Sequence, residues 1–211
     1  MPQTTKLAAG LLALSTMCGS QALAEGFYFG AGLGYTDAES DGGGTGTRYS
    51  ELDTGALGLT GGYSWDLDGS FAALEIDTDI SFGSDLKQNG TGVKCSSGTS
   101  APYFCSHDAT VRLRGTYGTE VANDWSLFGS LGLGFVMGDS AVTVPGATDS
   151  AIVGGLTAGF GAQKPLGSGV LRVEFIHDNF KNTLDKPSNG TVTYDPNWEA
   201  NSVKVTYLLK F

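Results

Sequence analysis

The chain has 211 residues, of which 33 are glycine and 16% are charged, with 12 basic against 22 acidic side chains. This length fits one domain; no collagen-like period accompanies the glycines, and 10% aromatic residues argue against disorder. The net charge of -10 at pH 7 excludes a typical nucleic-acid binder, because such a protein needs a basic face to displace counterions from phosphates.

The amino terminus predicts a secretory signal peptide over residues 1–24, cleaved from the mature chain. Lys6 supplies the positive charge, and Leu7–Met17 form an apolar stretch too short to span a membrane. Ala22–Ala24 offer the small residues of a cleavage site. Residues 25–211 remain as one domain, expected to be exported.

Eight segments of the exported domain alternate between apolar and polar or small residues. In chain order they are Phe27–Thr36, Thr54–Tyr63, Ala72–Phe82, Val111–Tyr117, Ser126–Met137, Ile152–Gly161, Leu171–Phe175 and Ser202–Phe211. Alternation with a period of two predicts strands that have one apolar face, and no stretch has a convincing helical period.

The connections between these segments alternate in length. Residues 64–70, 119–124 and 164–169 are short, whereas 83–108 and 178–201 are notably long. Long outer loops and short periplasmic turns at opposite ends are typical of outer-membrane barrels, which have an even number of strands. The sequence therefore predicts an all-β fold: an eight-stranded, antiparallel, up-and-down transmembrane β-barrel. Aromatic residues at strand ends (Tyr63, Trp65, Tyr117, Trp125 and Phe211) would form its periplasmic girdle.

Charged residues on the polar strand faces need partners, because an unpaired charge is costly to bury. Opposite residues of an antiparallel pair have numbers with a constant sum, so one register places Glu75 beside Arg114 and Asp77 beside Arg112. The predicted interior network holds four acids and four bases: Glu75, Asp77, Asp79, Glu174, Arg112, Arg114, Arg172 and Lys204.

This balanced network predicts a filled lumen, since an eight-stranded barrel is only wide enough for its own side chains. Inward glycines would make room for the long charged side chains, namely Gly30, Gly32, Gly34, Gly58, Gly132 and Gly134. The alternative is that the charges form a selectivity filter or a proton path.

Cys95 and Cys105 are predicted to form one local disulfide, because an even pair in an exported chain is typically oxidised. The alternative is a metal site, for which His107 is the only histidine nearby and the ligand set is incomplete.

Two segments resemble the OmpA-type outer-membrane β-barrel superfamily, in particular the small surface proteins of alphaproteobacteria. Residues 171–180 are similar to the Arg-x-Glu-Tyr-x-Tyr-x-Asp-Phe run of their penultimate strand, with Phe175 and His177 in place of the tyrosines. Residues 201–211 are similar to their closing strand. The resemblance implies that this strand carries the signal read by the barrel assembly machinery, through Val203, Val205, Tyr207, Leu209 and Phe211.

The expected function is structural or interactive: an integral, monomeric outer-membrane protein that supports the envelope and exposes adhesive loops at the cell surface. A narrow porin-like channel for small solutes or ions is the main alternative. Some relatives modify lipid A, and His177 with Ser150 are the candidate residues here, but the expected His-x-Ser arrangement is absent. We expect no enzyme activity, no cofactor and no metal site. The expected partners are outer-membrane lipid, lipopolysaccharide, the assembly machinery and a host surface ligand.

Overall fold

The computed structural model describes residues 25–41, 49–83, 85–88, 105–141, 148–185 and 197–211. Eight strands form the barrel wall: β1 (Gly26–Asp41), β2 (Tyr49–Asp66), β3 (Ser70–Ser81), β5 (Ala109–Ala122), β6 (Trp125–Ala141), β7 (Thr148–Leu166), β8 (Gly169–Asp185) and β9 (Asn197–Lys210). A two-residue strand, β4 (Lys87–Gln88), lies between β3 and β5 in the sequence. None of the described residues forms a helix long and apolar enough to cross a membrane.

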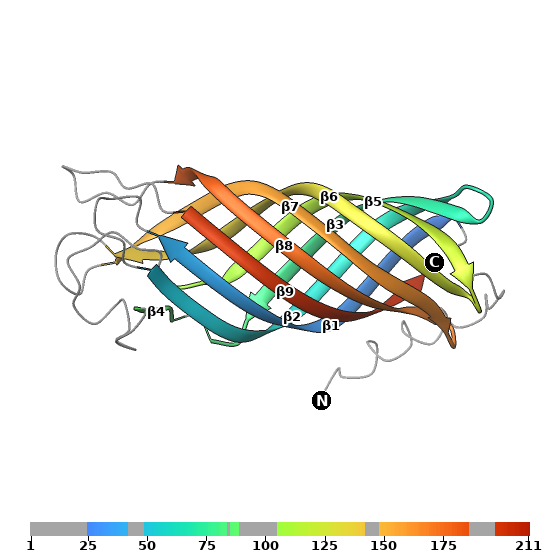
Figure 1. Cartoon of the computed structure of the whole chain (residues 1–211), viewed down its shortest axis with the longest axis horizontal. Helices are drawn as coiled ribbons and strands as arrows, with labels where there is room; N and C mark the ends of the chain where they lie inside the picture. The colour runs from blue at the N-terminus through green and yellow to red at the C-terminus, as the bar shows by residue number, and fades with distance from the viewer. Residues whose placement is uncertain (1–24, 42–48, 84, 89–104, 142–147, 186–196) are drawn as a thin grey trace, which may run out of the picture.

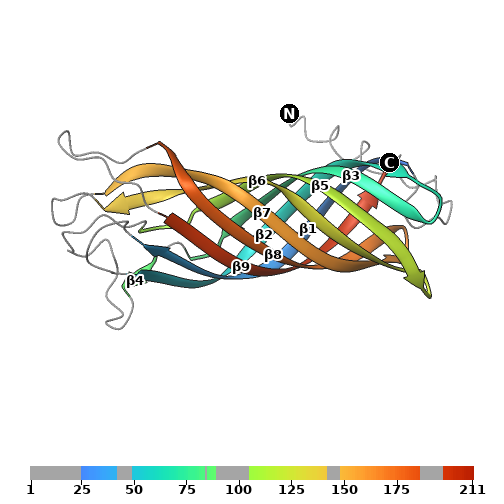
Figure 2. The same cartoon turned by 45° about the horizontal axis from the view of Figure 1, so that its top comes forward.

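The sheet closes on itself, as the sequence predicts. Neighbouring wall strands are antiparallel throughout, and β1 pairs with both β2 and β9. Figures 1 and 2 show the strands tilted steeply around one elongated barrel. The prediction of eight antiparallel strands is confirmed; β4 is an addition that lengthens the wall beside β2.

The outward faces of the strands form an apolar band around the barrel. On β1 it runs from Phe27 to Tyr35, and on β6 from Trp125 to Met137. At about 3.3 Å per residue and a strand tilt near 40°, these stretches span roughly 20 and 30 Å, on either side of the ~25 Å typical of membrane barrels.

The strands continue well past the upper edge of this band, which the sequence prediction missed. Residues 178–201, predicted as a loop, include the ends of β8 and β9, and β1 runs six residues beyond Tyr35 to Asp41. At the same rise and tilt, β1 projects roughly 15 Å above the band. We call this part of the barrel, above the apolar band, the outer extension.

The outer extension has polar residues on its outer face and apolar residues on its inner face, which is the reverse of the apolar band. Asp37 and Glu39 point outward on β1, whereas the intervening Ala38 is buried. The same holds on β9, where Glu199 is exposed and Trp198 and Ala200 are buried. The hydrogen-bonded pairing of the strands therefore continues without a break into the outer extension, while the apolar residues change from the outer to the inner face of the barrel wall.

Candidate functional site

The charged side chains predicted to line the lumen are brought together inside the barrel. All eight are at most 4% exposed, and they come from β3, β5, β8 and β9. The predicted register is also observed, because Glu75 lies opposite Arg114 and Asp77 opposite Arg112.

Arg112 holds two carboxylates at the outer side of this network. Its Nε donates to Oδ1 of Asp178 at 3.0 Å and its Nη2 to Oδ2 at 2.6 Å, the two-point geometry that makes arginine–carboxylate pairs strong. Its Nη1 donates to Oδ2 of Asp79 at 2.5 Å. One guanidinium therefore links β3, β5 and β8 across the lumen.

Arg114 makes the corresponding link one layer lower. Its Nη1 and Nη2 donate to the two carboxylate oxygens of Glu174 at 2.7 and 3.1 Å. Its Nη2 also donates to Oδ2 of Asp77 at 3.3 Å, and Ser130 donates to Oε1 of Glu174 at 2.9 Å.

Lys204 joins two neighbouring acids of β3. Its Nζ lies 2.6 and 2.8 Å from the carboxylate oxygens of Asp77 and 2.7 Å from Oδ1 of Asp79. The space for this ammonium group comes from Gly58 on β2, where an added Cβ would overlap Lys204 Cε and lie 2.5 Å from Nζ. Of the inward glycines predicted to make room for charged side chains, Gly58 is the one placed directly against a charged head group.

Arg172 closes the network at its lower end. Its Nη1 donates to Oε1 of Glu75 at 2.5 Å, an oxygen that also accepts from the Tyr28 hydroxyl at 2.5 Å. Its Nε donates to Oε1 of Gln163 at 3.0 Å. The guanidinium carbon lies 4.8 Å from the centre of the Phe128 ring, within cation–π range.

Two features of the network differ from the sequence prediction. The residues directly opposite one another are not the nearest ionic partners: Arg114 to Glu75 and Arg112 to Asp77 are both 3.6 Å, longer than the contacts to β8. Long side chains reach diagonally across a narrow lumen, which register alone does not capture. Asp178 was also missed, giving five acids to four bases, although it shares the inward parity of Arg172 and Glu174.

A lower apolar seal lies between the network and the end of the barrel that has the short turns. Tyr28, Ala73, Val170 and Leu208 form one buried cluster, at 5% exposure or less. Phe71 on β3 and Phe128 on β6 are similarly buried.

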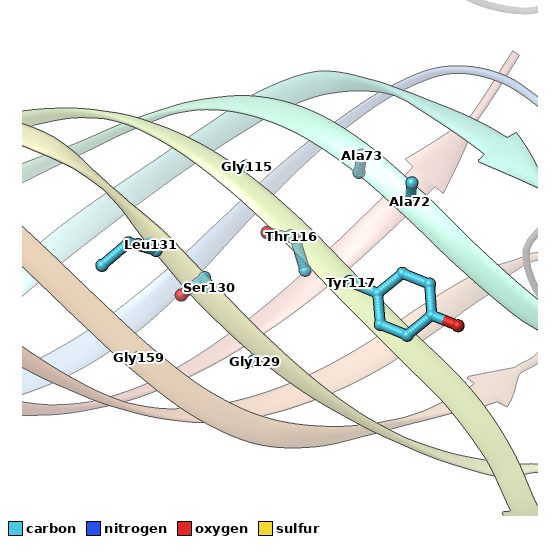
Figure 3. A pocket seen from close by; sticks show the side chains of 9 residues that line it. All are labelled: Ala72, Ala73, Gly115, Thr116, Tyr117, Gly129, Ser130, Leu131 and Gly159. Atoms are coloured by element: carbon cyan, nitrogen blue, oxygen red, sulfur yellow. The ribbon is translucent and has the colours of Figure 1, made fainter.

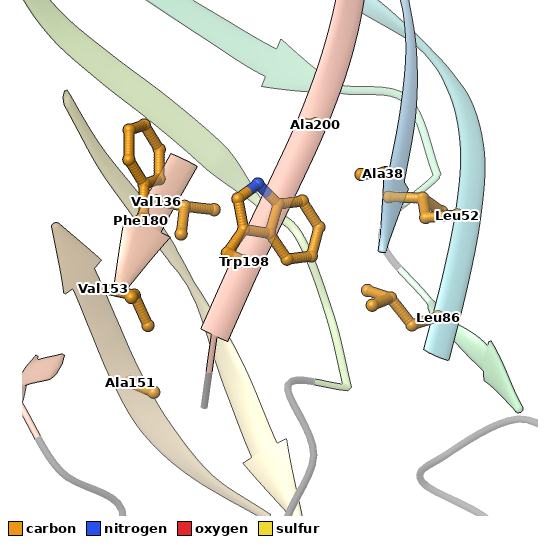
Figure 4. Packing of buried hydrophobic residues seen from close by; sticks show 9 residues of the cluster. All are labelled: Ala38, Leu52, Leu86, Val136, Ala151, Val153, Phe180, Trp198 and Ala200. Carbon is orange, nitrogen blue, oxygen red and sulfur yellow. The ribbon is translucent and has the colours of Figure 1, made fainter. Parts of the chain in front are cut away.

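An upper apolar seal fills the outer extension. It consists of nine buried residues: Ala38, Leu52, Leu86, Val136, Ala151, Val153, Phe180, Trp198 and Ala200. Figure 4 shows the Trp198 indole between the side chains of β6 to β8 on one side and those of β1, β2 and Leu86 on the other. The charged layer is thus enclosed between two apolar layers.

Two short segments complete the wall of the outer extension where β3 and β5 stop short of their neighbours. We call residues 85–88 and 105–108 the wall insert. It pairs with β2 through β4, and internally Leu86 N donates to the Cys105 carbonyl at 2.8 Å. Ser106 N donates to the Asp139 carbonyl at 3.1 Å, and Asp139 N to the Ser106 hydroxyl at 2.7 Å, which joins the insert to β6.

Cys105 lies in this insert and is 3% exposed. Cys95 falls outside the described residues, so their pairing stays a prediction. Within the described part of the chain, no cluster of three or more His, Cys, Asp or Glu side chains could hold a metal ion.

The family of this protein follows from comparison with known proteins. The chain matches the model of the outer membrane protein beta-barrel domain over residues 7–206. The chain belongs to this family. The apolar band therefore lies in the outer membrane of a Gram-negative bacterium, with the outer extension at the cell surface.

Two solved structures are similar to this chain. Ail, the attachment invasion locus protein of Yersinia pestis, is 13% identical, with 88% of this chain and 100% of that chain covered and a TM-score of 0.50. Neisserial surface protein A is 10% identical, with 92% and 100% covered and a TM-score of 0.49. No curated protein matches the sequence.

The closing strand of this outer-membrane barrel presents its predicted assembly residues to the outside. Val203, Val205, Leu209 and Phe211 are 41–65% exposed, in register with the apolar band. Tyr207 donates its hydroxyl to the Leu166 carbonyl at 2.8 Å, and Phe211 N donates to the Phe27 carbonyl at 3.0 Å. Their role as an assembly signal stays a prediction.

His177 and Ser150, the candidate residues for lipid A chemistry, lie far apart. His177 pairs with Ala158, and Ser150 lies eight residues further along β7, roughly 25 Å away at ~3.3 Å per residue. His177 sits in the middle of β8 rather than near its end, and its Nδ1 lies 3.0 Å from the side-chain oxygen of Asn201. They form no catalytic pair.

A shallow hollow of about 500 Å³ lies on the wall over β3, β5 and β6. Its lining includes the small residues Ala72, Gly115 and Gly129 beside Tyr117 and Leu131 (Figure 3). No carboxylate, histidine, cysteine or lysine lines it.

Proposed function

We propose that this barrel is a structural and surface-interaction protein of the outer membrane, and neither a channel nor an enzyme. The observation that carries the proposal is the filled lumen: a paired ionic layer between two apolar seals, with Trp198 1% exposed in the upper seal and Phe71 1% exposed beside the lower one. A hydrated ion crossing this path would have to displace buried aromatic rings and break several charge-assisted bonds at once.

The outer extension supports the interactive part of the proposal. A β-barrel with its own apolar core is a rigid support, and here β1 ends roughly 15 Å above the apolar band. Binding residues are commonly carried on loops that a rigid scaffold positions. We propose that the connections 89–104 and 186–196 are the segments that contact a host surface ligand.

The charge of the outer extension bears on its partners. Asp37 stands opposite Asp53 between β1 and β2, and Glu39 opposite Glu199 between β1 and β9. Like charges facing each other across strands repel, and lipopolysaccharide is itself anionic. Contact with lipopolysaccharide at this face would therefore need bridging divalent cations, and a chelator should release it.

A binding comparison tests the proposed function. Full-length barrel and a variant with residues 89–104 and 186–196 replaced by short Gly-Ser connections would be refolded in the same lipid. Both would be measured against host matrix proteins and lipopolysaccharide. We expect binding by the full-length chain that falls at least tenfold in the variant. Equal binding by both, or by neither, would contradict the role of these connections.

A further inference from the structure

His107 occupies an unusual position at the outer end of the lumen. It belongs to the wall insert, is 3% exposed, and lies between the upper seal and the ionic layer. Its Nε2 lies 2.7 Å from the Thr110 hydroxyl, and its ring centre is 4.8 Å from that of Trp198 at an angle of 63°. The imidazole is thus packed as part of the apolar core.

The second ring nitrogen has no partner. Nδ1 of His107 is buried and makes no hydrogen bond to any described residue. A neutral imidazole leaves this nitrogen as an unpaired acceptor, which is a modest cost. A protonated imidazole would instead bury an unpaired N–H and a charge, which costs considerably more.

The charges around His107 do not supply a partner for that proton. Arg112 from β5, Asp79 from β3 and Asp178 from β8 face it, while β9 contributes the neutral Trp198. Arg112 already binds both acids. Burial, reinforced by the positive charge of Arg112, lowers the pKa of His107 to about 4, so the residue is neutral at pH 7.

The wall insert is bonded to the barrel separately from the pairing of the eight wall strands. Cys105, Ser106 and Asp108 bond to Asp139 and Met137 of β6, and β4 pairs with β2, whereas the eight wall strands pair with one another without the insert. The insert can therefore detach without unpairing the barrel, in the way that a local segment opens before a whole fold does.

We propose that the wall insert is an acid-sensitive latch, which detaches from β6 when His107 takes up a proton from solvent and so exposes Trp198 at the outer mouth. His107 binds the proton less well in the closed latch than in the open one. The equilibrium constant for closing is therefore at its maximum above the ordinary histidine pKa of 6.5. It falls about tenfold per pH unit until the pH reaches about 4, roughly 300-fold in all.

Quenching of Trp198 fluorescence by acrylamide tests the latch. Trp65 and Trp125 would be replaced by phenylalanine, leaving Trp198 as the sole emitter in the full chain, refolded in lipid vesicles. Quenching is expected to be weak at neutral pH and to increase reversibly at least threefold near pH 4, with the strand signal in circular dichroism unchanged. His107→Gln and His107→Phe remove the titrating group, and Phe also keeps a ring against Trp198.

We expect both variants to resist quenching at both pH values. An unchanged Trp198 in the parent protein near pH 4 would overturn the proposal. So would acid-induced quenching that is the same in the parent and in both variants, because the response would then come from another group, such as the carboxylates of the ionic layer.

Discussion

Gly58 determines whether Lys204 can reach its two carboxylates. The Lys204 ammonium is fixed by three contacts of 2.6–2.8 Å to Asp77 and Asp79, so it cannot move aside freely. In Gly58→Ala the new Cβ would overlap Lys204 Cε and lie 2.9 Å from Oδ1 of Asp79. Overpacking a filled core costs about 1–3 kcal/mol, and moving a buried charge from its partners adds to this. We expect a loss of about 2–4 kcal/mol in the free energy of unfolding.

Gly61→Ala is the matched control, because it changes the same residue type on the same strand. Its Cβ would point outward and meet only ordinary contacts, the nearest being Phe29 Cδ2 at 3.9 Å. We expect no loss, or a gain of up to about 1 kcal/mol from the stiffer unfolded chain. Both variants would be unfolded reversibly by urea in lipid vesicles and followed by tryptophan fluorescence and heat-modifiable gel mobility.

A double-mutant cycle separates the clash with Lys204 from a general intolerance at residue 58. In a Lys204→Ala background the extra methyl has room, so Gly58→Ala should then cost less than about 1 kcal/mol, giving a coupling energy of about 1–3 kcal/mol. Equal unfolding free energies for Gly58→Ala and Gly61→Ala, or a cycle without coupling, would refute the reasoning.

Further predictions concern the network, a turn and the carboxyl terminus. Arg112→Met leaves Asp178 and Asp79 buried without their main partner and should cost about 3–5 kcal/mol in urea unfolding, with partial recovery in Arg112→Met/Asp178→Leu; no loss would mean that the pair is not needed. In the β5–β6 turn Asn123 has φ 51°, so Asn123→Val should lower stability by about 1–2 kcal/mol and Asn123→Gly should not, a ranking that thermal unfolding in detergent would check. Deleting Phe211 should reduce the amount of folded barrel in outer-membrane fractions severalfold while refolding in vitro proceeds, and unchanged levels would exclude an assembly role.

The membrane part of the barrel could be predicted from sequence because lipid imposes one rule on every strand. Outward residues must be apolar, so the alternation of apolar with polar or small residues in a segment such as Phe27–Thr36 indicates a strand. The same parity placed Glu75, Arg114 and the other charges inside. Closure and antiparallel pairing then followed from the number of strands and the lengths of the connections.

The outer extension was not predicted because its alternation has the opposite sense. Between Asn197 and Asn201 the apolar Trp198 and Ala200 face inward and the polar residues outward, as in a soluble barrel. A prediction that requires apolar residues on the outward face ends the strand at this change, and it therefore assigned residues 178–201 to a loop. Asp178 was missed because it lies three residues beyond the predicted end of its strand at Phe175.

The wall insert could not be predicted from the alternation pattern. Its short segments take their conformation from β2 and β6, which are far away in the sequence, and Leu86 and His107 carry no pattern that marks them as buried. Only the folded barrel brings His107 against Trp198 and above Arg112.

Electrical conductance tests the filled lumen most directly. Purified full-length barrel, shown by its heat-modifiable mobility to be folded, would be inserted into planar lipid bilayers at neutral pH in concentrated salt. A lumen closed by two apolar seals and a paired ionic layer predicts no conductance steps above those of the lipid alone. Reproducible steps of uniform size from the folded protein would show an open path through the barrel and contradict a filled lumen.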